Sequence, residues 1–239
     1  MRRFLAIASL LLLAAPVARA DDGEDTACGI PAEVVAQIQG TLQAVVTQPN
    51  GGIFSPNRMW SAVVDRQGRL CSVTRIGDAW PGSRAIAMAK ASTANDFSND
   101  ALALSTANLY SATQPGGSLY GLNNSNPFNP AFLVQGNPKL AQALANAFGR
   151  TPGGIITFGG GVPLYSGGKV IGGLGVSGDS ACADHVIAYR MRRAVGLDAI
   201  PAGVGAGGTD NIDYLAAGEA PNGFKHVHCF PTDLPPDRI

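Results

Sequence analysis

Apolar residues recur at helical spacing in three stretches of this 239-residue chain. The stretches cover residues 31–47, 83–97 and about 180–195. In each, apolar positions follow at steps of three and four residues, which places them on one face of a helix. Pro31 suits the first turn of the first helix, and Asp179 or Ser180 can cap the third. The pattern predicts three amphipathic helices.

Two pairs of shorter segments have strand character and are joined by tight turns. Met59–Asp65 and Arg69–Ile76 flank the turn Asp65-Arg66-Gln67-Gly68, and Val162–Tyr165 and Lys169–Ser177 flank Ser166-Gly167-Gly168. Each pair predicts a β-hairpin. Neighbouring hairpins imply an antiparallel sheet whose faces the helices must cover. The fold class predicted is therefore α+β rather than a doubly wound parallel sheet.

Less regular segments lie between and after these elements. A short helix is expected at 100–111, capped by Ser98 or Asn99, and another at 138–148. Residues 114–130 predict a long ordered loop, typical of a functional region or an interface. A Gly/Ala/Pro linker at 196–208 leads to a tail with a strand-like piece at 211–215. We expect one domain at 21–195, an insertion at about 122–150 and a C-terminal extension at 196–239.

The first 20 residues have the features of a secretory signal. Arg2 and Arg3 precede an apolar run, Phe4–Ala15, and Ala18-Arg19-Ala20 matches a cleavage motif. The run is shorter than the roughly 20 apolar residues that span a bilayer, and no later run is long enough. We expect cleavage after Ala20 and a periplasmic or secreted protein without an integral membrane segment.

Net charge argues against a nucleic-acid partner. The chain has 17 Lys and Arg and 17 Asp and Glu. Cleavage after Ala20 would remove Arg2, Arg3 and Arg19, which leaves 14 basic and 17 acidic residues and a net charge of −3. Such a balance is not the basic footprint that nucleic acid or an anionic membrane attracts.

All four cysteines lie after the leader, at Cys28, Cys71, Cys182 and Cys229. In an oxidising compartment an even number suggests two disulfides. Four cysteines allow three connectivities, and the sequence alone does not choose among them. We favour Cys28–Cys71 with Cys182–Cys229, because the second pair would pin the C-terminal extension to the domain. The alternative is that one or more stay free. Without a CxxC pair, a zinc cluster is not expected.

Known catalytic motifs are missing. The chain has no GxSxG, HExxH or SxxK set with partners. Its glycines match neither GxxxxGK[ST] nor a strand–GxGxxG–helix unit, so no nucleotide is expected. The chain has no CxxCH motif, which excludes the usual covalent attachment of a c-type haem. These observations favour a binding protein over an enzyme.

Five segments together carry a resemblance to a known family. They are AVVDRQGRLCSV, AIAMAKASTANDF, QPGGSLYGL, FGGGVPLYSGGKVIGGLGVSG and DSACADH, in that order. This order resembles the GlcG/HbpS family of small haem-binding proteins, a module also found in propanediol-utilisation proteins. The resemblance implies an antiparallel sheet of about five strands with flanking helices. It also implies a homo-oligomer such as an octamer, and haem binding or haem-linked sensing in some members.

The resemblance, together with the chemistry of haem, selects candidate site residues. Haem requires an axial ligand, an apolar slot and cations for its propionates. Lys90 and Thr93 match the family's Lys-x-x-Thr positions. Lys90 could pair with a propionate and Thr93 could act as an oxygen ligand; alternatively, both are structural. The other candidates for the haem site are Arg84, Phe97, Phe158, Gly159, Gly160, Gly161 and His185. His226 and His228, with Cys229, or His185 alone, are candidate metal ligands.

Three functions remain open. The first is an exported protein that binds haem b non-covalently, in a slot between the Lys90/Thr93 helix and the 158–178 hairpin. Its partner would be a membrane sensor or a redox protein. The second is an enzyme or accessory subunit in which Lys90 and Arg84 hold a small carboxylate. The third is a structural oligomer whose glycines serve tight subunit packing.

Overall fold

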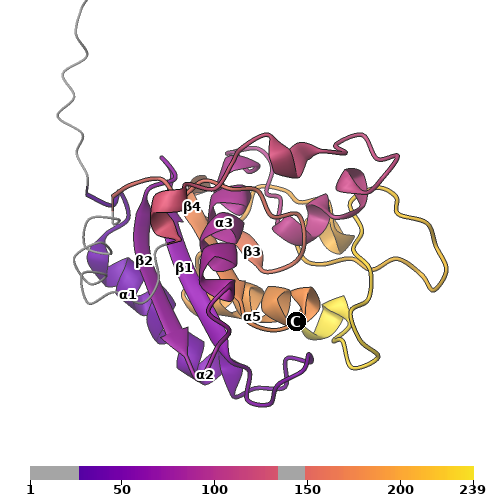
Figure 1. Ribbon diagram of the computed structural model, residues 1–239, viewed down its shortest axis with the longest axis horizontal. Coiled ribbons are helices and arrows are strands. Elements are labelled where there is room, and N and C mark those ends of the chain that lie inside the picture. Colours follow the sequence, from indigo (N-terminus) through magenta and orange to yellow (C-terminus); the bar gives the residue numbers. More distant parts are fainter. Residues whose placement is uncertain (1–26, 134–148) are drawn as a thin grey trace, which may run out of the picture.

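The computed structural model describes residues 27–133 and 149–239 (Figure 1). A four-stranded antiparallel sheet forms its middle layer. The strands are β1 (Met59–Asp65), β2 (Leu70–Ile76), β3 (Gly161–Ser166) and β4 (Lys169–Ser177), in the order β2-β1-β4-β3. The α+β class is confirmed. Within the described residues the sheet has four strands rather than about five.

Helices cover both faces of this sheet. On one face lies α3 (Ser83–Asp96); on the other lie α1 (Ala32–Gly40), α2 (Leu42–Val46) and α5 (Ala181–Ala194). Alternation along the strands divides the core accordingly. Val63 and Leu174 join the core beneath α5, whereas Ala62 and Val64 pack against α3. Short 3-10 helices complete the chain: η1 (Thr106–Leu109), η2 (Ser111–Thr113), η3 (Leu122–Asn124), η4 (Pro130–Phe132), η5 (Ala206–Gly208) and η6 (Pro236–Arg238).

Both predicted hairpins are present. Gly167 and Gly168 turn the second one with φ of 58° and 75°, values that L side chains adopt only with strain. In the first, β2 begins at Leu70 rather than at Arg69, because the Arg69 N–H bonds to the Asp65 carboxylate at 2.9 Å within the turn.

Glycines bring the second hairpin into backbone contact with α3. A Cβ atom at Gly173 or Gly175 would collide with the carbonyl oxygen of Ala91 or Ala87, and one at Gly161 with that of Lys90. The missing side chains let helix and sheet approach closely. The predicted haem slot between this helix and the hairpin is therefore wrong: protein backbone fills that space.

The predicted helices at 83–97 and 180–195 are confirmed as α3 and α5, and Ser180 caps α5 by accepting from the Ala183 N–H at 3.2 Å. The helix expected at 31–47 is divided. At Thr41 the N–H bonds to the Ile38 carbonyl, three residues back, at 3.2 Å, so α1 ends and α2 restarts at Leu42.

Two predicted elements are wrong. Residues 100–105 form a loop, because Ser98 and Asn99 bind nearby backbone N–H groups: Asn99 Oδ1 accepts from Leu102 at 3.0 Å and Ser98 Oγ from Leu104 at 3.0 Å. Helical structure there is limited to η1 and η2. The piece at 211–215 contributes one isolated bridge, Tyr214 to His226, rather than a strand. The helix expected at 138–148 falls outside the described residues.

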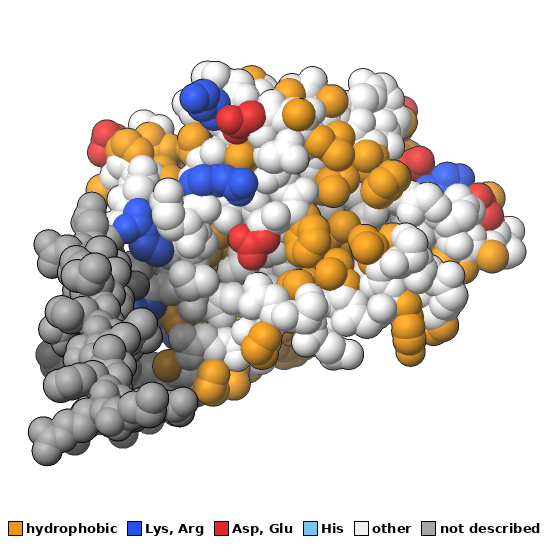
Figure 2. All heavy atoms as spheres, turned by 90° about the horizontal axis from the view of Figure 1, so that it is seen from above, with side chains coloured by type: hydrophobic (Ala, Val, Ile, Leu, Met, Phe, Trp, Pro, Cys, Tyr) orange, Lys and Arg blue, Asp and Glu red, His pale blue; other side chains and the backbone are white. Residues whose placement is uncertain are grey.

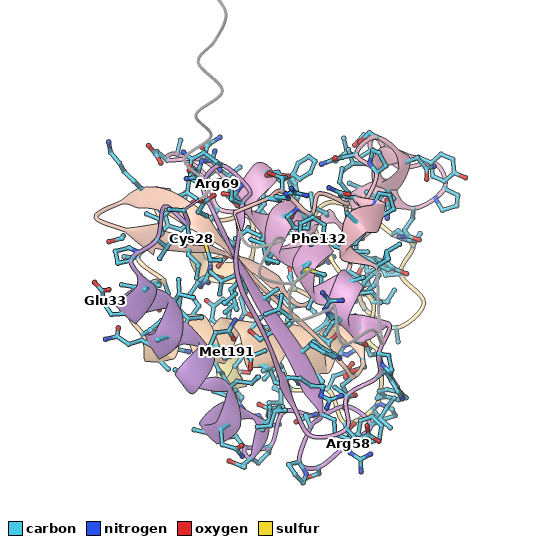
Figure 3. All side chains as sticks on the ribbon, turned by 60° about the vertical axis from the view of Figure 1, so that its left-hand side comes forward. Cys28, Glu33, Arg58, Arg69, Phe132 and Met191 are labelled. Atoms are coloured by element: carbon cyan, nitrogen blue, oxygen red, sulfur yellow. A yellow bond between two sulfur atoms is a disulfide. The ribbon has the colours of Figure 1, made fainter. Side chains whose placement is uncertain are left out.

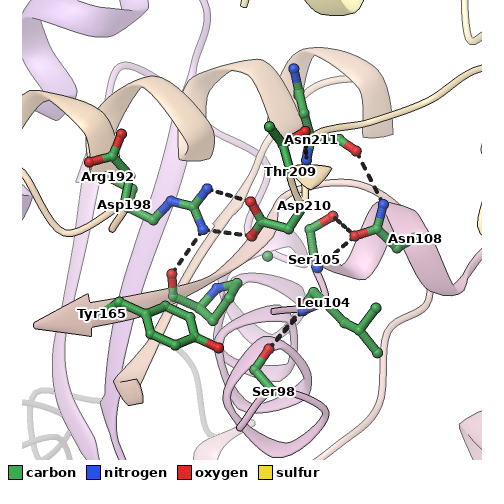
Figure 4. Close-up of polar contacts among 12 residues, drawn as sticks. Ser98, Leu104, Ser105, Asn108, Tyr165, Arg192, Asp198, Thr209, Asp210 and Asn211 are labelled. Atoms are coloured by element: carbon green, nitrogen blue, oxygen red, sulfur yellow. Dashed lines mark hydrogen bonds and ion pairs between the residues drawn. The ribbon is translucent and has the colours of Figure 1, made fainter. Parts of the chain in front are cut away.

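The C-terminal tail is fastened to the domain at several points. Arg192 of α5 and Asp210 form a buried bidentate ion pair with two 2.6 Å contacts (Figure 4). Asn108 Nδ2 donates to the Asn211 carbonyl at 3.1 Å. The disulfide Cys182–Cys229 adds a covalent link. The tail thus packs along α5 and η1.

Both disulfides that we favoured are confirmed, Cys28–Cys71 and Cys182–Cys229. The first ties the segment before α1 to β2, near the labelled Cys28 in Figure 3. Among the described residues, no helix is both long enough and apolar enough to cross a membrane.

Candidate functional site

Lys90 lies at the centre of the predicted site, but its ammonium group is already paired with a carboxylate of the same chain. Its Nζ is 2.7 Å from Asp184 Oδ2 of α5 and 3.1 Å from the Val176 carbonyl, and the side chain is fully buried. The Phe158 ring lies under the ammonium at 4.8 Å. Burial lowers the pKa of Lys90, and burial raises the pKa of Asp184 to about 6. Lys90 therefore has no free charge for a haem propionate.

The predicted glycine turn wraps this ion pair. Gly160 has φ of 122°, and a Cβ there would lie 2.7 Å from Lys90 Nζ. A Cβ at Gly159 would collide with the Ala181 carbonyl oxygen at the start of α5. The turn brings Phe158, Gly159, Gly160 and Gly161 to Lys90 as predicted, but to enclose it rather than to form a ligand slot.

Thr93 is a structural residue. Its Oγ1 donates to the Ala89 carbonyl at 2.7 Å and accepts from the Ile156 N–H at 2.9 Å, and it is fully buried. A hydroxyl engaged in both directions and shielded from solvent is not placed to bind iron. Thr93 instead fixes the segment at 154–156 against α3.

The remaining candidates on α3 are separated from each other. Arg84 is buried near the start of the helix, donates to the Phe132 carbonyl at 3.2 Å, and has its pKa lowered by burial. Figure 3 labels Phe132, whose ring joins the core beside α3. Phe97 lies at the other end, half-buried at the C-cap. The structure does not bring Phe97 and Arg84 together.

His185 faces the tail rather than a ligand cavity. It is fully buried on α5, with Nε2 3.1 Å from Asn211 Oδ1 and 3.0 Å from the Ile212 backbone nitrogen. Burial lowers its pKa to about 4, so the ring is neutral. Nδ1 has no hydrogen-bond partner. The expected ligation by His185 would need the tail to move away.

The predicted His226/His228/Cys229 metal set is not assembled. Cys229 is disulfide-bonded, so it offers no thiolate. His226 is buried, whereas the side chain of His228 is 55% exposed and stacks on Tyr214 with 4.0 Å between ring centroids. The segment is not a strand, so the two histidines do not share a face.

An apolar pocket of about 280 Å³ lies on the outer side of α3, away from the glycine hairpin. Its walls come from the first half of α3, from residues 123–133 and from 154–156. The lining residues are Ala85, Ile86, Ala89, Asn123, Asn126, Pro127, Phe128, Leu133, Gly154, Ile155 and Ile156. Figure 2 shows, on the face seen from above, hydrophobic side chains gathered around the middle with few charges among them.

The sequence indicates this pocket only in part. Helical spacing places Ile86 and Ala89 on one face with Thr93, and residues 114–130 predict a loop typical of a functional region or an interface. No pattern in the sequence joins the two. The segment at 153–156 joins them: the Ile156 N–H donates to Thr93 Oγ1 of α3, across 63 residues of sequence, and Gly153 forms an isolated bridge with Phe128 of the loop. No local pattern encodes a contact of that range.

The pocket fits one part of haem. Its aliphatic walls and Phe128 suit the apolar face of a porphyrin, and Asn123 and Asn126 add amide groups. Within the described lining there is no His, Cys, Met or Tyr, the side chains that usually bind haem iron. The described pocket therefore offers apolar burial but not an iron ligand.

Two proteins of Citrobacter freundii are similar to this chain in sequence. An uncharacterised 15.0 kDa protein of the dhaT–dhaS intergenic region of Citrobacter freundii is 33% identical over 127 residues, 53% of this chain and 68% of the relative. The corrinoid adenosyltransferase PduO of C. freundii is 33% identical over 136 residues, 57% of this chain but 32% of PduO. The chain thus spans about a third of that enzyme.

A solved structure described as a PduOC–haem complex is also similar. It is 26% identical, with a TM-score of 0.51, over 70% of this chain and 96% of that one. The family model described as "Haem degrading protein HbpS-like" matches residues 55–192, from the approach to β1 through most of α5. With more than half of its length matched, this chain belongs to the HbpS-like family.

Proposed function

We propose that this protein is exported and binds haem non-covalently, as haem b, to store, scavenge or sense it without turnover. The observation that carries the proposal is the apolar pocket between α3 and the segments at 123–133 and 154–156. Family membership and the similarity to the PduOC–haem complex support it. The signal-like leader and the two disulfides support export.

The pocket is small for the whole of haem. Its volume of about 280 Å³ lies just below the range of roughly 300–1,000 Å³ that is typical of ligand sites. Ile86, Ile155 and Phe128 would cover part of the apolar ring, and the propionates would remain near solvent. Because this lining supplies no usual iron ligand, apolar burial would provide most of the affinity. A homo-oligomer, such as an octamer, would enclose more of the ligand, and we propose that assembly too.

The two other functions receive less support. In the carboxylate-binding function Lys90 and Arg84 hold a substrate, but Lys90 already pairs with Asp184 and Arg84 with the Phe132 carbonyl. In the structural-oligomer function the glycines serve contacts between subunits, yet Gly161, Gly173 and Gly175 contact α3 of their own chain.

Titration of residues 21–239 with haemin, followed by absorbance with albumin as the non-specific control, tests the proposal. We expect saturable binding at about one haem per chain with micromolar affinity or better, about −8 kcal/mol. Ala85→Trp would fill the pocket from α3 and weaken binding at least about tenfold, equal to about 1.4 kcal/mol.

Ala44→Trp is the matched control, because Ala44 is exposed on α2, away from this pocket, and should titrate like the parent. A folded Ala85→Trp protein that binds haemin as tightly as the parent would rule out this pocket. Non-saturating binding by the parent would reject haem itself.

A further inference from the structure

The disulfide Cys182–Cys229 has a buried histidine beside it. The ligand atoms of Cys182, Cys229 and His226 all lie within 4.8 Å of one another. Two thiolates and an imidazole at this spacing form a donor set that zinc favours. The oxidised sulfurs cannot bind a metal as thiolates, so the chemistry of this cluster depends on its redox state.

The backbone holds the ring of His226 in place. Its Nδ1 is 2.6 Å from the Val227 carbonyl oxygen, which can only accept, so Nδ1 carries the proton. Nε2 therefore carries the lone pair, which accepts one long hydrogen bond from the Gly159 N–H at 3.3 Å. A backbone carbonyl that fixes the other ring nitrogen is the usual support for a zinc-bound histidine.

The position of the disulfide favours its reduction. Cys182 lies in the first turn of α5, where the helix N-terminus stabilises a thiolate. Its backbone N–H points at Cys229 Sγ, at 3.1 Å. A cavity of about 450 Å³, lined by His228, Cys229, Phe230, Pro231 and Asp233, opens beside the half-buried Cys229. An incoming thiolate could attack Cys229 there while Cys182 leaves as a stabilised thiolate.

We propose that reduction of Cys182–Cys229 creates a zinc site in which Cys182, Cys229 and His226 bind the metal. A thiol reductant supplies the electrons: two thiols become one disulfide, and the two protein sulfurs each gain an electron and a proton. Zn²⁺ then displaces the two thiol protons and takes the His226 lone pair. Three protein ligands leave the fourth tetrahedral position to water, which the cavity beside Cys229 admits.

The other disulfide provides an internal comparison. Cys28 and Cys71 lie near Asp65, but that carboxylate already accepts from the Gly29 N–H and from both the backbone N–H and the Nε of Arg69, at 2.8–2.9 Å. This cluster contains no histidine. We therefore expect zinc binding at one disulfide and not at the other.

The test uses the mature chain carrying Cys28→Ser and Cys71→Ser, so that one cysteine pair remains. The protein is reduced anaerobically with a phosphine, freed of reductant and titrated with Zn²⁺ against a chromophoric chelator. We expect one Zn²⁺ per reduced chain and none per oxidised chain. Co²⁺ should give thiolate-to-metal absorption in the reduced protein only. Equal Zn²⁺ binding by the two redox states would overturn the proposal.

Single variants then identify the ligands. His226→Ala should weaken Zn²⁺ binding by about 100-fold or more, whereas His228→Ala, the exposed neighbour, should bind like its parent. A chain with Cys182→Ser and Cys229→Ser, which keeps Cys28 and Cys71, should bind no Zn²⁺ when reduced. The assignment fails if His226→Ala binds Zn²⁺ as tightly as its parent, or if the Cys182/Cys229 variant binds one Zn²⁺. Circular dichroism of each variant checks that a loss of Zn²⁺ binding is not caused by unfolding.

Discussion

Lys90 and Asp184 form an ion pair that is shielded from water, and it shows how a residue that matches a family motif can serve structure. The pair joins α3 to α5 across the end of the sheet, with Nζ 2.7 Å from Oδ2. Asp184 also accepts from the Asp179 N–H at 2.9 Å. Removing two charges from water is costly, and the attraction between them offsets that cost. If one partner is lost, the other remains buried without a counter-charge.

Asp184→Asn should therefore destabilise the fold strongly. It removes the counter-charge of Lys90 while keeping the side-chain size, and we expect a loss of about 3–5 kcal/mol of unfolding free energy. Urea denaturation would measure it. The double variant Lys90→Met with Asp184→Asn should recover most of the loss, because neither charge is then buried. A double variant no more stable than Asp184→Asn would contradict this explanation.

Two buried histidines should make the protein sensitive to acid. Burial lowers the pKa of both His185 and His226 to about 4, against 6.5 in the unfolded chain. Between these values the unfolded chain binds more protons, so stability falls as pH falls from about 6.5 to 4. Each histidine contributes on the order of 1 kcal/mol per pH unit. Asp184, with its pKa raised from 3.8 to about 6, acts in the opposite direction and offsets one of the two.

Urea denaturation between pH 7 and pH 4.5 measures this dependence. His185→Gln should flatten the slope, because the amide side chain does not titrate in this range. A slope that His185→Gln does not alter would show that other groups govern the acid response.

At the scale of elements, the contact between α3 and β4 is the most extensive that the structure describes. It depends on Gly173 and Gly175, which occupy the sheet face beneath the helix where side chains would otherwise stand. Ala62 and Val64 of β1 fill the adjoining part of the same face. Small residues therefore set the distance between helix and sheet.

Gly175→Ala should push the helix and sheet apart. The added methyl would meet the Ala87 carbonyl, which is backbone and cannot rotate away, so we expect a loss of about 1–3 kcal/mol or more. Thermal or urea denaturation would measure it. Gly40→Ala is the control, because a Cβ there meets nothing within 4 Å, and in the helix α1 it should stabilise the fold slightly, by about 0.5–1 kcal/mol. Equal effects of the two substitutions would remove the packing explanation.

Elements with a clear period could be predicted from the sequence, and contacts between them could not. The hairpins and α3 follow from alternation and helical spacing within short windows. The break at Thr41 and the loop after Asn99 depend on single side-chain and backbone hydrogen bonds, which leave the hydrophobic pattern unchanged. Lys90 does lie at the centre of a cluster, but its partner, Asp184, is 94 residues away along the chain.

At the scale of the whole molecule, α5 and the tail enclose one side of the sheet while α3 and the loops enclose the other. Arg192–Asp210 and Cys182–Cys229 hold the tail over α5. The apolar pocket lies on the opposite side, beyond α3. The proposed haem site and the proposed zinc site are therefore on different parts of the molecule, so a variant of one need not alter the other.

The order of the cysteines along the chain has a consequence for how the protein matures. Each cysteine is bonded to the next one in sequence, the first to the second and the third to the fourth, across 43 and 47 residues. When a chain enters an oxidising compartment from its N-terminus, Cys28 is the only partner for Cys71 until Cys182 arrives. Random pairing would give the native connectivity in one case of three. If the protein is exported as proposed, vectorial entry would favour this connectivity from the outset, and folding should need an oxidant for the thiols but little help from a disulfide isomerase.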